Sequence, residues 1–107
     1  MTAAELLAHY RRTPDVEPLR AHFAFARVPG AAEDDDGRDD RQPLRDELAA
    51  LLLHDLQADD YALVRALFAV EGERSEALGN GGGETMKALG YLLWRYGRRE
   101  DVFLLLD

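Results

Sequence analysis

Residues 88–106, ALGYLLWRYGRREDVFLLL, decide how the chain folds. Leucines spaced three or four apart before Gly97 predict a helix with one apolar side, and glycine is the usual residue just past a helix end. Glu100 or Asp101 then provides the acidic start of a second helix, which continues to the end of the sequence. The stretch therefore predicts two helices joined by a short turn.

The same signals predict two more helix pairs upstream. Thr2 and Thr13 can cap helix starts through their hydroxyl groups, and Pro43 fits the first turn of a third helix. Asp60 caps a fourth helix, which continues weakly past Gly72. The predicted pairs span residues 2–26, 43–71 and 84–107 of a single domain that covers 1–107.

Two linkers separate the pairs. Residues 28–41 contain the run EDDDGRDD, which is too charged to bury and has no apolar period, so a surface loop is expected there. Residues 79–83 contain four glycines and predict a flexible connector, because glycine loses the most entropy when it is ordered.

An internal repeat links the three pairs. Shifting the third and fourth helices forward by 41 positions places Leu52 on Leu93 and Asp60 on Asp101, and shifting them back by 45 places Asp60 on Asp15. Each copy has two leucines, a short turn, an aspartate at a helix start and an apolar residue four positions later. A period of about 40 residues built from paired helices is typical of α-solenoids.

In its leucines, glycine, acidic residue, valine and following leucine pair, the stretch Ala88–Leu105 resembles HEAT-like and armadillo-type helical repeats. That resemblance implies an all-α fold, a right-handed stack of about three antiparallel helical hairpins forming an α-α superhelix, and a tendency to bind macromolecules. The motif is one of packing, so it implies no catalytic residue. The acidic segment and residues 72–83 depart from a regular array.

Charge and composition exclude several classes of function. The net charge of -8 argues against nucleic acid and anionic membrane surfaces as partners, since both recruit cations. The absence of cysteine excludes disulfides and thiolate chemistry. No apolar run approaches the ~20 residues of a membrane span, and the first residues do not form a secretory signal, so a cytoplasmic location is expected.

No motif predicts a catalytic residue, a cofactor site or a metal site. If Gly37 were the turn glycine of an EF-hand loop, Ala32 and Pro43 would occupy positions that require carboxylates. A phosphate-binding (Walker) loop requires glycine, lysine and then serine or threonine in sequence, whereas here Glu84 follows the glycines and Lys87 comes three residues later. The three histidines lack ligand spacing, and Ser75, the sole serine, has no adjacent base.

The best functional candidates are surface residues that could bind a partner. On the fifth predicted helix, Lys87, Tyr91, Trp94 and Arg98 lie three or four residues apart, away from the main leucine stripe. Trp94 is nevertheless expected to be buried, because its repeat equivalent, Leu53, is also apolar. Arg20 and Arg65 occupy equivalent positions and could line one ridge, although pairing with nearby carboxylates is the simpler expectation.

The sequence therefore predicts a non-catalytic protein-interaction module. Its apolar last helix favours either a homodimer formed through the C-terminal helices or a truncated chain, rather than a lone monomer. One alternative is a nucleic-acid-processing enzyme domain of HEAT-like fold, which requires a basic concave groove. Another is an engineered or trimmed repeat fragment without activity of its own.

Overall fold

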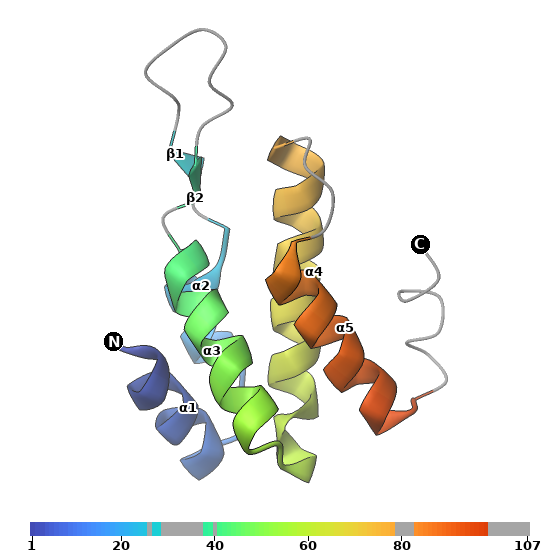
Figure 1. Cartoon of the computed structure of the whole chain (residues 1–107). Helices are drawn as coiled ribbons and strands as arrows, with labels where there is room; N and C mark the ends of the chain where they lie inside the picture. Colours follow the sequence, from blue (N-terminus) through green and yellow to red (C-terminus); the bar gives the residue numbers. More distant parts are fainter. Residues whose placement is uncertain (26, 29–37, 40, 79–82, 99–107) are drawn as a thin grey trace, which may run out of the picture.

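The computed structural model describes residues 1–25, 27–28, 38–39, 41–78 and 83–98. This part of the chain is helical apart from one pair of two-residue strands (Figure 1). In chain order the elements are α1 (Ala3–Arg12), a 3-10 turn η1 (Glu17–Leu19), α2 (Arg20–Phe23), β1 (Arg27–Val28), β2 (Arg38–Asp39), α3 (Gln42–His54), a 3-10 turn η2 (Ala58–Asp60), α4 (Tyr61–Leu78) and α5 (Glu84–Tyr96).

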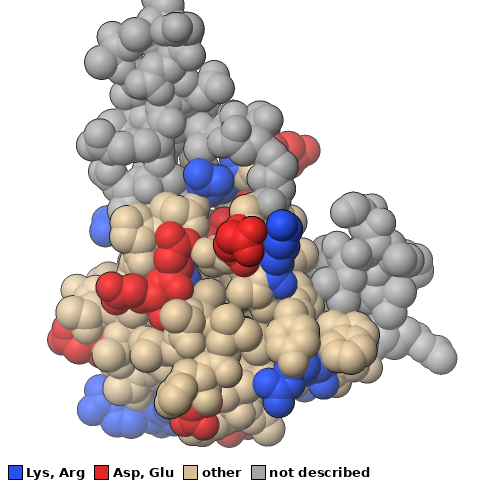
Figure 2. All heavy atoms as spheres, viewed as in Figure 1, with Lys and Arg blue, Asp and Glu red and all other residues tan. Residues whose placement is uncertain are grey.

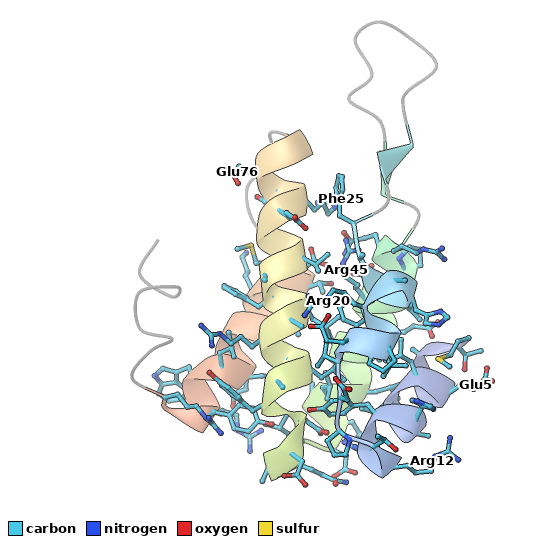
Figure 3. The ribbon with its side chains drawn as sticks, turned by 180° about the vertical axis from the view of Figure 1, so that it is seen from behind. Glu5, Arg12, Arg20, Phe25, Arg45 and Glu76 are labelled. Carbon is cyan, nitrogen blue, oxygen red and sulfur yellow. The ribbon has the colours of Figure 1, made fainter. Side chains whose placement is uncertain are left out.

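The helices form two layers. Helices α1, α3 and α5 lie side by side, with α3 contacting both of its neighbours, and α2 and α4 lie behind them (Figures 1 and 3). Helix α4 also packs closely on α5. One hydrophobic core joins the layers, and its fully buried leucines are Leu6, Leu48, Leu52, Leu63, Leu67, Leu89, Leu92 and Leu93.

Residues close in sequence mark several helix ends. The Thr2 hydroxyl accepts the Glu5 amide at 3.1 Å, and the Glu5 carboxylate accepts the Thr2 amide in return, which forms the capping box that starts α1. Asp15 accepts the Glu17 amide at the start of η1. Gly97 ends α5 with φ of 64°, a left-handed conformation that glycine adopts without steric cost.

The second predicted helix is shorter than expected, so its predicted end at Ala26 is wrong. Helical backbone runs from Glu17 through Phe23, and Ala24 is already extended. The Phe23 carbonyl accepts a hydrogen bond from Arg45 at 3.0 Å instead of continuing the helix. A tertiary contact therefore overrides the local preference of the alanines that follow.

The predicted surface loop at 28–41 contains a short ladder at its ends. Arg27 pairs with Asp39 and Val28 with Arg38, in antiparallel register. Residues 33–37 of the acidic run lie outside the described residues, as do residues 79–82 of the glycine connector and the sixth helix predicted from Glu100 or Asp101 to the end of the sequence.

A buried ion pair ties α3 to α4. Arg45 is fully buried and Glu71 nearly so, and the Arg45 Nε donates to Glu71 Oε1 at 2.9 Å. Gln42 binds both partners, through its Oε1 to Arg45 and its Nε2 to Glu71. Together with the bond to Phe23, these contacts join α2, α3 and α4; Figure 3 shows Arg45 between these helices.

Candidate interaction surface

Two aromatic side chains are exposed to solvent on the side of α5 that faces away from the core. Tyr91 is 51% exposed and Trp94 is 68% exposed. Their rings stack with centroids 6.2 Å apart and an interplanar angle of 26°. Large aromatic side chains normally contribute their area to cores or interfaces, so an exposed stacked pair is the most prominent apolar feature of the described surface.

The predicted burial of Trp94 is wrong. Helix α5 fills the core with Leu89, Leu92 and Leu93, which are completely buried, and this leaves the opposite side of the helix to solvent. The apolar equivalent that suggested burial, Leu53 of α3, is itself 43% exposed. The side chains of Leu53 and Trp94 therefore both point toward solvent and not into the core.

Basic side chains lie on both sides of the stacked rings along α5. The Arg95 guanidinium lies 6.0 Å from the centre of the Tyr91 ring, within the range of a cation–π contact. Lys87, one turn earlier, pairs with Glu84 at 3.4 Å. We call Lys87, Tyr91, Trp94 and Arg95 the α5 aromatic surface. Figure 2 shows uncharged side chains over the lower part of α5, with basic side chains at both ends of that stretch.

Helical spacing predicted that Arg98 would lie beside Tyr91 and Trp94, but Arg98 contacts a different aromatic ring. Its guanidinium lies 3.8 Å from the centre of the Tyr61 ring at the start of α4. The helix ends at Tyr96 and Gly97 turns the chain, so the spacing of three or four residues no longer applies at position 98. Arg95, which was not among the predicted residues, lies four residues after Tyr91 and is the arginine that contacts its ring.

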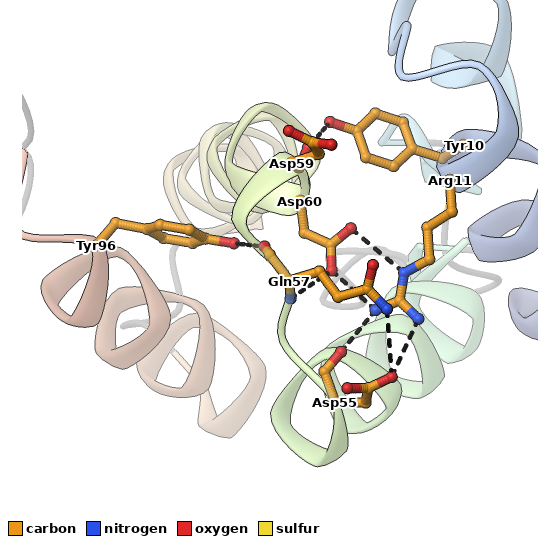
Figure 4. A network of polar contacts seen from close by, with 7 residues as sticks. All are labelled: Tyr10, Arg11, Asp55, Gln57, Asp59, Asp60 and Tyr96. Atoms are coloured by element: carbon orange, nitrogen blue, oxygen red, sulfur yellow. Dashed lines mark hydrogen bonds and ion pairs between the residues drawn. The ribbon is translucent and has the colours of Figure 1, made fainter.

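A polar network fixes the end of α5 that carries these rings (Figure 4). The Tyr96 hydroxyl donates to the Gln57 carbonyl at 2.6 Å, and its ring meets Tyr61 edge to face with centroids 5.3 Å apart. From the other side, the Tyr10 hydroxyl donates to the Asp59 carbonyl at 2.5 Å. The turn between α3 and α4 is therefore held by one tyrosine from α1 and one from α5.

A buried carboxylate completes this network. Asp60 is fully buried; it accepts the Gln57 amide at 3.0 Å and pairs with Arg11 at 2.8 Å. The hydrogen bond to Asp60 raises the pKa of the Arg11 guanidinium, which stays charged. Burial, followed by the nearby Asp60 charge, raises the pKa of Tyr96 to about 12. Both effects keep the protonation states that the contacts require, so the network serves to position α5.

Arg20 and Arg65 lie on the other layer. Both line a shallow hollow of about 310 Å³ between α2 and α4, together with Tyr61, Ala62, Ala66 and Ala69. Arg20 pairs with Glu17 at 2.8 Å, and that hydrogen bond raises the pKa of the Arg20 guanidinium. Of the two arrangements predicted for Arg20, a shared arginine ridge and pairing with a nearby carboxylate, the structure shows the pairing with a carboxylate.

A second hollow of about 450 Å³ continues along α4 toward α5. Arg65 lines it at one end and Glu73 and Glu76 at the other, around an apolar floor that includes Phe68 and Met86. Charges of both signs therefore line the hollows along α4. This mixture does not provide the continuous basic groove that binding a phosphate backbone requires.

Among the described residues, no group of three or more acidic, histidine or cysteine side chains is arranged so that it could hold a metal ion. The three histidines are exposed or half-buried and lie on different helices. In the same part of the chain, none of the helices has the length and apolar character that crossing a membrane requires.

Comparisons with known proteins add no relatives. The chain matches no protein-family model, and searches of curated proteins and of solved structures find no match.

Proposed function

We propose that the chain is a non-catalytic protein-interaction module of stacked helical pairs, similar in plan to HEAT-like repeats, that binds a partner protein through the α5 aromatic surface. The observation that carries the proposal is the stacked pair of Tyr91 and Trp94, exposed by 51% and 68%. Aromatic and arginine side chains dominate binding energy at protein interfaces. The surface offers both on one rigid helix.

The arrangement of the helices supports the stacked plan. Helices α1, α3 and α5, the first members of the predicted pairs, form one layer, and α2 and α4 lie behind them, with α4 packed most closely on α5 of the next predicted pair. In stacked repeats each pair contacts its neighbours and leaves an outer face available for partners. The α5 aromatic surface lies on such an outer face.

Affinity capture from lysate of the native cell tests the proposal. We expect the wild-type chain to retain a defined protein that the double variant Tyr91→Ala with Trp94→Ala does not retain. His22→Ala is the matched control, because it also removes an exposed ring, from α2 in the other layer. Circular dichroism and urea unfolding should show that all three chains fold equally well.

Retention of the same proteins by the wild-type chain and the double variant would refute this assignment of the binding surface. Because both aromatic side chains are more than half exposed, their loss should leave the core intact. A difference in capture therefore reports on binding and not on folding.

A further inference from the structure

The α5 aromatic surface reverses the charge balance of the chain. Overall, 21 acidic residues outnumber 13 basic ones, whereas helix α5, residues 84–96, contains two basic residues, Lys87 and Arg95, and the single carboxylate of Glu84. At physiological salt the Debye length is about 8 Å, so the more distant acidic residues are largely screened from a ligand bound at this surface. A bound segment would therefore respond mainly to Lys87 and Arg95.

The geometry sets the size of a matching ligand. Lys87 and Arg95 flank the two rings at positions four residues before and four residues after Tyr91, which places them ~12 Å apart along the helix axis. Two turns of helix or about four extended residues would cover that distance. The rings between them present apolar faces, and Arg95 already lies against one of these rings.

Lys87 can exchange its present carboxylate partner for a carboxylate of a ligand. Its present partner, Glu84, lies 3.4 Å away, and the side chains of the two residues are 71% and 93% exposed. Such surface pairs contribute little to stability. A carboxylate from a ligand can replace Glu84 at small cost.

We propose that the α5 aromatic surface binds a short acidic amphipathic segment of another protein. Its apolar side chains cover Tyr91 and Trp94, and its carboxylates reach Lys87 and Arg95. This inference rests on the proposed function and adds the chemistry of the partner. The complementary charges determine which segments bind, and the stacked rings provide most of the contact area.

Two other occupants fit less well. A second copy of the chain that presented its own α5 aromatic surface would bring its Lys87 and Arg95 against the same cations, which costs free energy. Single-stranded nucleic acid also stacks on aromatic rings. However, it carries a charge on every nucleotide, and beyond the α5 aromatic surface it would meet the acidic remainder of the molecule.

Selection from a display library of random peptides tests the proposal. Peptides of about 16 residues can cover the surface in helical or extended form. Clones are selected on the full wild-type chain and counter-selected on the Tyr91→Ala, Trp94→Ala double variant. We expect the surviving clones to be enriched in Asp and Glu beside Leu or Phe, and to bind less tightly as salt is raised.

The single tryptophan provides a direct measurement of affinity. Trp94 is the only tryptophan in the chain, so its emission should shift to shorter wavelength when a selected peptide covers it. The double variant Lys87→Glu with Arg95→Glu should bind the acidic clones at least about tenfold more weakly at low salt. Arg12→Glu, an exposed charge reversal at the end of α1, is the control and should leave affinity unchanged.

The outcomes separate this inference from the proposed function. Clones that require Tyr91 and Trp94 but are basic or uncharged would overturn the acidic partner and leave the interaction surface in place. The absence of any clone that depends on the two rings would count against both. A concentration-dependent shift of Trp94 emission without peptide would identify a second copy as the occupant, and a shift with single-stranded RNA alone would identify nucleic acid. Either result would overturn the inference.

Discussion

At the scale of single residues, the interior of the protein depends on charged groups as well as leucines. Arg45 and Glu71 lie in the core with 0% and 4% of their side chains exposed. The Gln42 side chain forms a hydrogen bond with each of them. A buried pair of this kind adds little net stability compared with apolar residues, but the loss of one partner leaves an uncompensated charge. The pair therefore matters most when it is broken.

We expect Arg45→Leu to lower the free energy of unfolding by about 3–5 kcal/mol, because Glu71 would remain buried without its cation. Urea unfolding followed by circular dichroism measures the change. The double variant Arg45→Leu with Glu71→Leu should recover much of the loss. If the double variant were as unstable as the sum of both single variants, the ion pair would not be the cause.

Tyr96 makes stability depend on alkaline pH. Its folded pKa is raised to about 12 from the ordinary value of 10.0, chiefly by burial. The neutral phenol is thus favoured in the folded state, and its contribution is fully present below pH 10 and is lost as the pH rises through about 12. We expect stability to fall over this range, and less steeply in Tyr96→Phe. Urea midpoints measured across the range test this, with the exposed Tyr91→Phe as the control.

The sequence contains part of this residue-level information. Arg45 lies three residues before Leu48 and seven before Leu52, so the helical period places it on the buried stripe even though its charge suggests the surface. Nothing local shows that Glu71, 26 positions later, would meet it. The prediction that Trp94 is buried is wrong because apolar side chains at two equivalent positions can share an outer face as well as a core.

At the scale of elements, helices with strong local signals were predicted well. The leucine spacing and Gly97 predicted α5 with its end at Tyr96, and Thr2 predicted the start of α1. The end of α2 and the pairing of β1 with β2 depend on contacts between residues distant in sequence, and the local pattern does not contain them.

Helix α4 contains a glycine that its surroundings do not require. A Cβ atom added at Gly72 would meet nothing within 4 Å, and the residue lies inside the helix. Glycine in a helix interior costs about 0.5–1 kcal/mol relative to alanine. We expect Gly72→Ala to stabilise the protein by about that amount in thermal unfolding. Ala69→Gly, one turn earlier on the same helix, should destabilise by a similar amount; a change of the same sign in both would contradict the reasoning.

At the scale of the whole molecule, the net charge of -8 makes copies of the chain repel one another, and the α5 aromatic surface is exposed. Loss of net charge promotes association of proteins that expose apolar surface. We expect sedimentation to show growing self-association as the pH is lowered toward the isoelectric point, where the repulsion disappears. Trp94→Ala should weaken that association, whereas His22→Ala should not. Association unchanged by Trp94→Ala would place the contact elsewhere on the molecule.

The two-residue ladder between β1 and β2 makes the molecule easy to modify. Because Val28 pairs with Arg38, the chain leaves and re-enters the ladder at neighbouring points, whatever the length of the sequence between them. Doubling the length of a flexible connection costs only about 0.6 kcal/mol. A peptide tag or fluorescent reporter inserted after Val28 should therefore leave the helices in place, and it offers a handle for immobilising the protein with α5 unobstructed.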